Sequence, residues 1–524
     1  MTAAAGRRSL RVGTISLLLL LTLIGLVTFH RAGGKHNPEE LDQGAYLHVS
    51  LLIHEHRALT DGNRHPLYPA LLAPFASREH SFFPTAKLVT LVLGMAGFVF
   101  VTWRVARRWS TGMALAVLLA CGSSFVWTAS GLRCEVLLIP LLWVFWETGA
   151  AGFEKPHMWV IAGCAAGLCY LTKANGTLLV MALVATWLFS GQLLDRRRWN
   201  LLLFLAPFTL VVSPLTWWNY RIHGSAFYNH NTQHVMWLDS WQDAGRVHTP
   251  LPTIRSWFAE HGLGDLITRE FMGIFRLPDL WLFILFFVAV VVLVARRRAD
   301  LKVVARYALT RWEVNLAASF VAIHAVLLAW YTPIVSSSRF VIPMQPVMWL
   351  VVLLAIVDRI PEGWIVGLRR MQVPLAILIA TALVISPFML DLHDPYDDPI
   401  VTYPEVEAWI RSTDETSLVY GPSQNFPQWM FIPDFRFAHV PPDVSFTEML
   451  ERMQQQDTRF LLVDREMLQN RPALGRLVVD RPGEGLAPVP GSEAFVVSES
   501  DRGNSVRWIL FERTNGGLNC TSLH

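Results

Sequence analysis

The sequence predicts a polytopic α-helical membrane protein of about 11 transmembrane helices, with a small α/β domain at its C-terminal end. The 524 residues are 53% hydrophobic and only 16% charged, whereas a soluble domain is about 25% charged. The charges are also unevenly divided. Positions 391–524 hold 21 acidic and 11 basic side chains out of 41 and 44 in the whole chain. These counts indicate a basic, apolar body joined to an acidic, soluble-like tail. The high apolar fraction excludes a disordered chain, and the low charged fraction disfavours a soluble enzyme.

Eleven apolar runs account for the predicted spans. The first, near 12–29, follows a basic start and has no small-residue cleavage site behind it, so we expect a retained span and not a signal peptide. Several runs have no more than the about 20 residues that cross a bilayer. The other ten runs lie near 85–103, 110–128, 133–149, 158–172, 174–190, 199–218, 279–295, 313–331, 340–358 and 371–390.

Clusters of arginine predict the orientation of these spans. If the N-terminus is cytoplasmic, the cytoplasmic loops carry the clusters, and the short loops on the other side carry about one basic residue each. Cytoplasmic loops of membrane proteins are enriched in Lys and Arg, so this alternation supports the number of spans. It places loop 30–84, loop 219–278 and the tail on the extracytoplasmic side.

The tail has the pattern of a small α/β unit. Short runs of β-branched and aromatic residues predict strands, a helix is expected at 445–456, and Pro and Gly separate these elements. The predicted strands lie at 417–420, 460–463, 495–497 and 506–511. We therefore expect two domains, a membrane domain at 1–390 and a soluble extracytoplasmic domain at 391–524.

Loop 30–84 is long, and long loops that are not disordered are usually functional. Its apolar positions recur at helical spacing from Glu39 to Ile53, which predicts an amphipathic helix on the membrane surface. Asp42 lies near the first turn, where a carboxylate suits a helix N-terminus. By spacing alone, an N-terminal helix charge explains Asp42 better than a chemical role does. His54 and His56 point to different faces of a helix, so we predict no metal site there.

A few charged residues stand alone at span ends on the extracytoplasmic side. Arg133, Lys173 and Arg339 could bind a phosphate through charge at low dielectric. Alternatively, each long side chain only reaches the membrane interface. Arg221, in loop 219–278, is a weaker candidate of the same kind. Glu135 could orient an acceptor or bind a metal, or it could simply pair with Arg133.

Five segments in order resemble the GT-C glycosyltransferases. Those are polytopic enzymes that use polyprenyl-phosphate-linked sugars and include protein O-mannosyltransferases and the aminoarabinose transferases of lipid A. The resemblance covers about residues 1–390. The segments are D-x-x-x-Y at Asp42 and Tyr46 with R-H-P-L-Y-P at 64–69, the acidic position at Glu135, G-L-C-Y-L-T-K at 167–173, P-L-T-W-W-N-Y-R-I-H-G at 214–224, and R-F-V-I-P-M-Q-P at 339–346.

The resemblance implies transfer of a sugar from a polyprenyl-phosphate donor to an acceptor hydroxyl on the extracytoplasmic face, with inversion. Polyprenyl phosphate is a good leaving group, whereas a hydroxyl is a weak nucleophile that benefits from a base. Asp42 is then the general base, and Glu135 is the second catalytic candidate. The candidates for binding the substrate and the lipid phosphate are Lys173, Arg339, Arg133, His65, Tyr46 and Arg221.

The expected partners are the lipid-linked sugar donor, a glycan, lipid or protein acceptor, and membrane lipids, without nucleic acid. A divalent metal is compatible with this chemistry but is not predicted. The expected location is a bacterial inner (plasma) membrane. The alternative function is a transporter or flippase of lipid-linked glycan precursors. It is less favoured because the sequence shows no internal repeat and its lone charges lie at span ends on one side.

Overall fold

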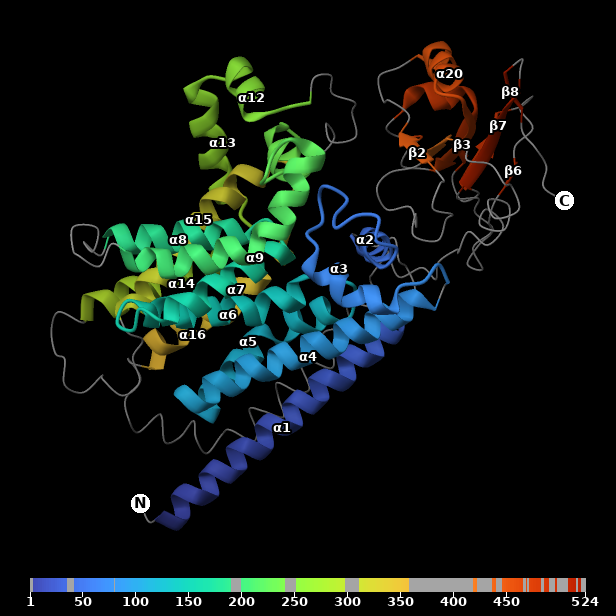
Figure 1. Ribbon diagram of the computed structural model, residues 1–524. Helices are drawn as coiled ribbons and strands as arrows, with labels where there is room; N and C mark the ends of the chain where they lie inside the picture. Colours follow the sequence, from blue (N-terminus) through green and yellow to red (C-terminus); the bar gives the residue numbers. More distant parts are fainter. Residues whose placement is uncertain are drawn as a thin grey trace.

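The protein is built around a bundle of long helices that run side by side across Figure 1. The computed structural model describes residues 3–34, 42–79, 81–189, 199–240, 251–296 and 311–357, together with shorter segments between 418 and 519. The long helices are α1 (Ala3–Gly34), α4 (Phe82–Arg108), α5 (Thr111–Ala129), α6 (Glu135–Gly152), α7 (Met158–Thr172), α8 (Gly176–Phe189), α9 (Asn200–His223), α14 (Leu280–Arg296), α15 (Arg311–Tyr331) and α16 (Gln345–Val357).

Ten of the eleven predicted spans coincide with one of these helices, and the eleventh, near 371–390, lies outside the described residues. In the described part, seven helices are long and apolar enough to cross a membrane. Helices α7 and α8 are apolar but shorter, and α14 follows α13 (Leu263–Phe275) after a bend of 90°. The chain is an integral membrane protein, and its total of eleven spans stays a prediction.

Small residues let the central helices approach closely. Helix α7 packs between α6 and α9. A Cβ atom added at Gly163 of α7 would lie only 2.2 Å from the carbonyl oxygen of Phe204 on α9. Between helices in lipid, close backbone packing replaces the hydrophobic driving force. The short spacing between α7 and α9 therefore depends on this glycine.

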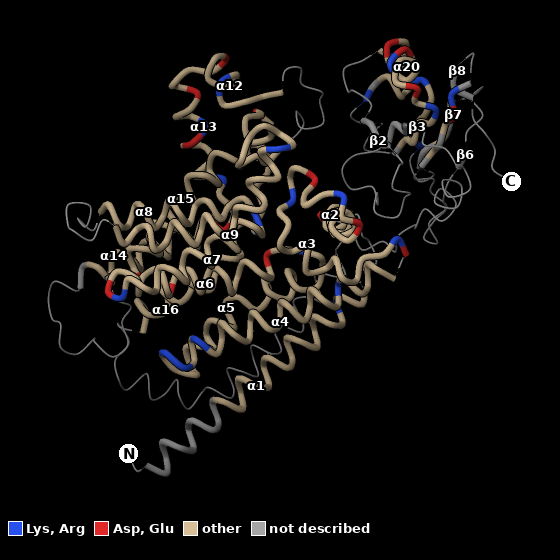
Figure 2. Tube along the Cα trace, in the orientation of Figure 1, with Lys and Arg blue, Asp and Glu red and all other residues tan. Residues whose placement is uncertain are grey.

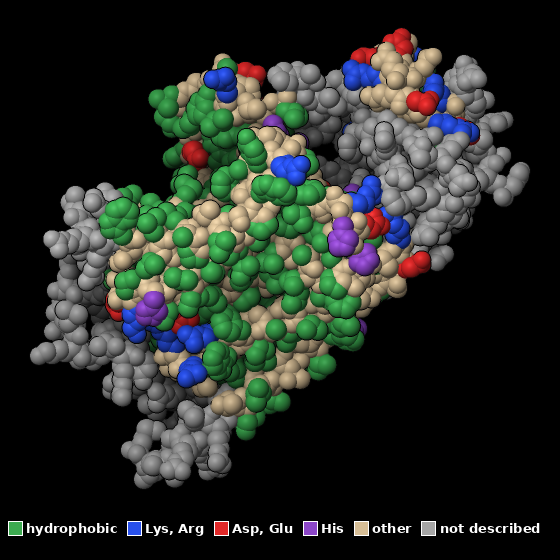
Figure 3. Space-filling view, viewed as in Figure 1, with side chains coloured by type: hydrophobic (Ala, Val, Ile, Leu, Met, Phe, Trp, Pro, Cys, Tyr) green, Lys and Arg blue, Asp and Glu red, His purple; other side chains and the backbone are tan. Residues whose placement is uncertain are grey.

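The surface of the bundle matches a lipid environment. Hydrophobic side chains cover most of its visible face in Figure 3, and the charges of the long helices lie mainly near their ends in Figure 2. At one such end, Arg104 and Arg108 pair with Glu147, and Arg108 also pairs with Glu313. Three helices, α4, α6 and α15, are thereby joined at a single charged cluster.

The helix predicted in loop 30–84 is present as α2 (Gln43–His54). It is followed by α3 (Leu67–Leu72) and a short 3-10 turn at Ala73–Phe75. Leu47 and Leu51 of α2 are buried in the same core as Tyr68 and Leu72. The apolar face of α2 therefore packs against protein, and this packing fixes the position of Asp42 just before the helix.

Loop 219–278 contains helices that the sequence did not lead us to expect. Helix α9 ends at His223 and is followed by the C-cap Gly224, whose φ of 72° is left-handed and favours glycine. The short α10 (His230–Gln233) and a 3-10 turn at Val235–Trp237 follow. After them come α12 (Ile254–Glu260) and α13.

The tail contains a sheet, as predicted, and its strands pair in both parallel and antiparallel fashion. Its strands run in the order β2-β1-β3-β7-β6, with β8 on β7. Strand β1 is parallel to β2 and β3, whereas β7 is antiparallel to β3. Helix α20 (Phe446–Gln455) packs on β3 and confirms the expected helix. The strands are β1 (Leu418–Gly421), β2 (Arg436–His439), β3 (Thr458–Asp464), β6 (Phe495–Val496), β7 (Trp508–Thr514) and β8 (Gly517–Asn519), with a separate hairpin of β4 (Val478–Arg481) and β5 (Gly485–Pro488).

Candidate active site

Asp42 lies at the N-cap of α2, but its side chain does not cap the helix. Its Oδ1 accepts a hydrogen bond from Arg64 at 2.8 Å, and its Oδ2 accepts one from Arg339, also at 2.8 Å. Arg64 comes from the segment between α2 and α3, and Arg339 from the 3-10 turn at Ser338–Phe340 before α16. The carboxylate is thus shared by two cations from distant parts of the chain. A carboxylate that served only as a charge at the helix N-terminus would not need these two partners.

The charges around Asp42 keep it ionised. Burial would raise the pKa of this carboxyl, but Arg64, Arg339 and Lys173 outweigh burial and hold its pKa well below the usual range. Arg64 is stabilised in turn, because Asp61 and Asp42 raise its pKa against the effect of burial. The Asp42 side chain is still 30% exposed. An ionised carboxylate is therefore accessible from the adjoining cavity.

A second ion pair lies beside the first. Lys173 follows the last turn of α7, and its Nζ is 2.7 Å from Oε1 of Glu135, the first residue of α6. The ring of Phe340 lies between the two sites, with Lys173 Nζ at 4.8 Å and the Arg339 guanidinium at 5.0 Å from its centroid. Glu135 is only 5% exposed. The structure pairs Glu135 with Lys173, a partner that the sequence did not suggest. Acceptor orientation and metal binding by Glu135 stay predictions.

Except for Glu135, the groups of the two ion pairs and Phe340 border a cavity of about 310 Å³. Its wall combines three cations and one carboxylate with amides, hydroxyls and a larger apolar part. The lining residues are Asp42, Tyr46, Asn63, Arg64, His65, Thr172, Lys173, Ala174, Asn175, Thr177, Leu178, Asn229, Asn231, Thr232, Met236, Leu327, Leu328, Tyr331, Arg339 and Phe340.

Two further predicted residues line this cavity. Tyr46 is buried, and its hydroxyl donates to Sγ of Cys134 at 3.0 Å. Burial raises the pKa of this phenol, so it stays protonated. His65 is buried with its ring against Tyr170, at a centroid distance of 4.7 Å. Burial lowers its pKa to about 4, so the imidazole is neutral at pH 7.

Arg133 and Arg221 do not line the cavity. The Arg133 guanidinium is stacked over Trp127, 3.6 Å from the ring centroid, and donates to the carbonyl of that residue. Arg221 is exposed on α9 and lies over Trp217 at 5.1 Å. Asn219 faces inward and donates to the carbonyl of Tyr228. A step of two residues turns a helix by about 200°, so Arg221 faces away.

Arg64 is the main site residue that the sequence left unassigned. It belongs to the R-H-P-L-Y-P segment and directly precedes His65. This neighbourhood was the feature of the sequence that could have identified Arg64 as a site residue. Asn229 could not have been found in this way, because it acts through the tertiary fold. Its amide donates to the carbonyl of Asn63 at 2.6 Å, and the backbone N–H of His230 donates to Gly62 at 2.9 Å. These bonds fix the start of loop 229–239 against the segment that carries Arg64.

In the part of the chain that the structure describes, no group of three or more His, Cys, Asp or Glu side chains is placed to hold a metal ion. His54 makes a hydrogen bond through Nδ1 with the carbonyl of Ala73 at 3.0 Å. His56 follows the helix with a positive φ of 55°.

Comparison with known proteins identifies the fold. No protein-family model and no curated protein matches the sequence. Among solved structures, ArnT from Cupriavidus metallidurans bound to undecaprenyl phosphate is similar with a TM-score of 0.53 at 14% identity, over 94% of this chain and 97% of that one. The apo form of that ArnT has a TM-score of 0.52 at 15% identity, over 97% and 98% of the two chains.

A third similar structure is the oligosaccharyltransferase AglB from Archaeoglobus fulgidus in complex with an inhibitory peptide and a dolichol-phosphate. It has a TM-score of 0.50 at 12% identity, over 93% of this chain and 74% of that one. The chain therefore has the fold that ArnT and AglB share. This confirms the predicted fold class, and identities this low carry the fold alone.

Proposed function

We propose that the protein is a membrane glycosyltransferase that moves a sugar from a polyprenyl-phosphate donor to an acceptor hydroxyl. The observation that carries this proposal is the cavity in which ionised Asp42 lies among Arg64, Arg339 and Lys173. The fold is that of ArnT and AglB, whose structures contain undecaprenyl phosphate and dolichol-phosphate. A site that gathers cations beside a carboxylate fits a reaction in which a phosphate leaves and a hydroxyl attacks.

The donor phosphate would be bound by the three cations. Arg64 and Arg339 offer planar guanidinium groups that match phosphate oxygens, and Lys173 adds a point charge. Nε of Arg339 is buried and has no hydrogen-bond partner among the described atoms. As the glycosidic bond breaks, the phosphate oxygen gains negative charge, and these cations would stabilise it. The apolar part of the wall, with Leu178 and Leu327, would accept the first isoprene units.

Asp42 would act as the general base, with inversion at the anomeric carbon. In the free protein its pKa is strongly lowered, so it is a weak base. A bound phosphate would compete for the same two arginines, and the pKa of Asp42 would then rise. The carboxylate would become a better acceptor for the hydroxyl proton when the donor is in place. Glu135 would hold Lys173 in position from behind the cavity wall.

Asp42→Asn tests this role. We expect the variant to lose at least about a hundredfold of its transfer rate, since a positioned base contributes typically 10² to 10⁴, while it still binds polyprenyl phosphate. The measurement is transfer from synthetic polyprenyl-phosphate sugars to extracted envelope glycans, lipids and proteins, with the protein reconstituted in vesicles. Glu79→Gln removes an exposed carboxylate outside the cavity and should leave the rate unchanged.

Full transfer by Asp42→Asn would refute the role of the base. If the wild-type protein moves the intact lipid-linked sugar across the vesicle membrane and transfers none of it, the transporter alternative replaces the enzyme. The same proposal places the site on the extracytoplasmic face of a bacterial plasma membrane, where the acceptor is a glycan, a lipid or a protein. Detection of labelled product in the glycan, lipid or protein fraction identifies the acceptor directly.

A further inference from the structure

Helix α13 has two faces of opposite character. One face holds apolar side chains that are largely exposed, with Phe271 exposed to 58%. The other face packs on the end of α15, where a Cβ added at Gly273 would lie 2.0 Å from the carbonyl oxygen of Ala329. The apolar face, by the spacing of its residues, carries the exposed Leu263, Ile267, Phe271, Ile274 and Phe275. Met272 is also exposed but lies off this face, along a second cavity.

The position of α13 indicates that membrane lipid covers this apolar face. Helix α14, which follows it, has its own exposed apolar residues, among them Trp281, Ile284 and Val288. The two helices meet at 90°, and in Figure 1 α13 stands across the direction of the long helices. If α14 runs along the membrane normal, α13 lies in the membrane plane, and its apolar face continues the lipid-facing surface of α14.

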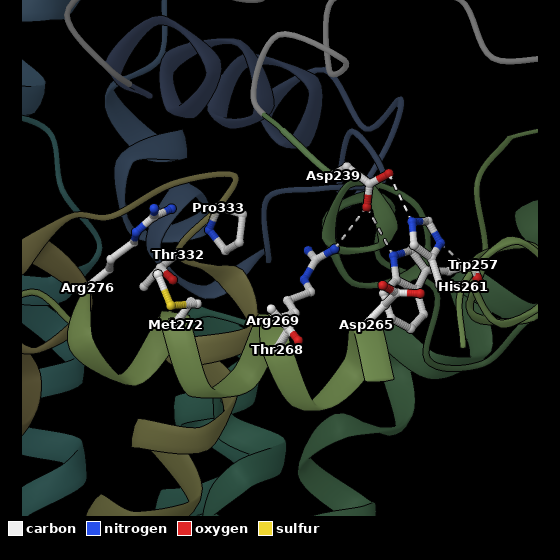
Figure 4. Close-up of a pocket in the computed structure, with 11 residues that line it drawn as sticks. Asp239, Trp257, His261, Asp265, Thr268, Arg269, Met272, Arg276, Thr332 and Pro333 are labelled. Carbon is white, nitrogen blue, oxygen red and sulfur yellow. Dashed lines mark hydrogen bonds and ion pairs between the residues drawn. The ribbon is translucent and has the colours of Figure 1, made fainter. Parts of the chain in front are cut away.

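The opposite side of α13 carries a buried cation. Arg269 is only 7% exposed. Its Nε donates to the carbonyl of Trp330 at 3.1 Å, and its Nη2 donates to the carbonyl of Leu238 at 2.9 Å. The guanidinium also lies over the Trp330 ring at 4.2 Å and 3.4 Å from Oδ1 of Asp239. Figure 4 shows Arg269 directed at Asp239, beside Trp257 and His261, along a shallow second cavity of about 260 Å³.

The two segments that Arg269 joins form part of the wall of the first cavity. Met236 and Tyr331 line that cavity, and each lies within two residues of a carbonyl that Arg269 binds. Trp330 reinforces this junction, since its Nε1 donates to the carbonyl of Met236 at 2.8 Å. One side chain on α13 therefore connects loop 229–239 to the end of α15 just behind the candidate active site.

We propose that α13 lies in the membrane surface at the cavity end of the bundle, with its apolar face among the lipids, and that Arg269 makes it a brace for the cavity wall. Arg269 is a positioning residue in this arrangement, because it touches wall segments and not the donor. A lysine could not replace it, since a single ammonium cannot direct a planar fork at two backbone segments at once. The membrane contact of α13 does not depend on the proposed function. Only the expected change in the donor KM rests on the proposed function.

The first experiment locates α13. A bimane label is placed at Phe271→Cys on the apolar face, at Asp265→Cys on the opposite side, and at Val288→Cys on α14 as a reference, in a background without native cysteines. The protein is reconstituted in phosphatidylcholine and phosphatidylglycerol vesicles that contain a nitroxide lipid. We expect Phe271→Cys and Val288→Cys to be quenched at least threefold more than Asp265→Cys. Equal quenching at positions 271 and 265 would overturn the membrane contact.

The second experiment tests the brace. Arg269→Gln and Arg269→Lys should both accelerate hydrogen exchange of the Trp237 and Leu238 amides at least tenfold and raise the donor KM at least fivefold, with kcat within twofold. Arg255 is an exposed arginine on α12, and Arg255→Gln is the matched control. It should change neither the amide exchange nor the donor KM. Unchanged exchange in both Arg269 variants would overturn the brace, and so would rescue by lysine. An inactive wild-type protein with accelerated exchange in the variants would refute the proposed function and leave the brace intact.

Discussion

Lys173 and Glu135 form an ion pair in which one partner is almost fully buried. Removing one partner of a buried pair leaves an unpaired charge at low dielectric, which costs about 3–5 kcal/mol. We therefore expect Lys173→Gln to lower the free energy of unfolding by about that much, and to weaken binding of polyprenyl phosphate. The measurements are denaturant unfolding in detergent micelles and a titration with the lipid phosphate.

The double variant Lys173→Gln/Glu135→Gln separates these two effects. It removes the orphaned carboxylate, so most of the lost stability should return, whereas binding of the lipid phosphate should stay weak. Binding at the wild-type level by the double variant would mean that Lys173 only neutralises Glu135. The alternative for Lys173, a side chain that merely reaches the interface, predicts no loss of stability in the single variant.

The single residues that could be predicted are those whose chemistry is unusual for their place in the sequence. Lys173 and Arg339 are lone cations at span ends, and Asp42 begins a conspicuous motif. Arg133 has the same sequence signature as Lys173, yet it is stacked on Trp127 and lies outside the cavity. A lone charge in the sequence indicates that the side chain needs a partner. The tertiary fold decides whether that partner is a ligand or another group of the protein.

At the scale of the elements, the apolar runs were sufficient to place ten helices, because hydropathy and length together define a span. Helices α12 and α13 were not predicted, since neither contains a long apolar run. The period of 3.6 residues was present at Leu263, Ile267 and Phe271 and could have predicted α13. The cluster around Arg269 could not have been predicted, because it joins segments that are about 30 to 60 residues apart.

The contact between α7 and α9 gives a prediction about elements. Gly163→Ala would place a methyl group against the Phe204 carbonyl, with 2.2 Å between the two atoms before any shift. The helices must then separate, and we expect a loss of about 1–3 kcal/mol, the usual cost of overpacking. Thermal unfolding in micelles measures this loss.

Gly264→Ala on α13 is the matched control, because a Cβ there meets nothing within 4 Å. Alanine in a helix is favoured over glycine by about 0.5–1 kcal/mol, so this variant should unfold at the same temperature or slightly higher. Equal stability of Gly163→Ala and the wild type would show that α7 and α9 are less tightly packed than the structure indicates.

At the scale of the whole molecule, the distribution of charge makes the two ends of the bundle different. Arg104, Arg107 and Arg108 crowd the last turns of α4. The cavity lies near α2, which precedes the start of α4 in the chain, and thus near the opposite end of that helix. The positive-inside rule assigns the arginine-rich end to the cytoplasm. The cavity end would then face the extracytoplasmic side, where lipid-linked sugars would meet their acceptors.

Thiol labelling in intact cells checks this orientation. Glu260→Cys places an exposed thiol at the end of α12, near the cavity end, and Arg107→Cys places one at the arginine-rich end. Since charge fixes the orientation of the whole bundle, a membrane-impermeant maleimide should label Glu260→Cys in intact cells, and Arg107→Cys only after permeabilisation. The wild-type chain, in which Cys121, Cys134 and Cys169 are buried and Cys164 is half-buried, gives the background that is subtracted. The reverse pattern would place the cavity in the cytoplasm and would refute transfer on the extracytoplasmic face.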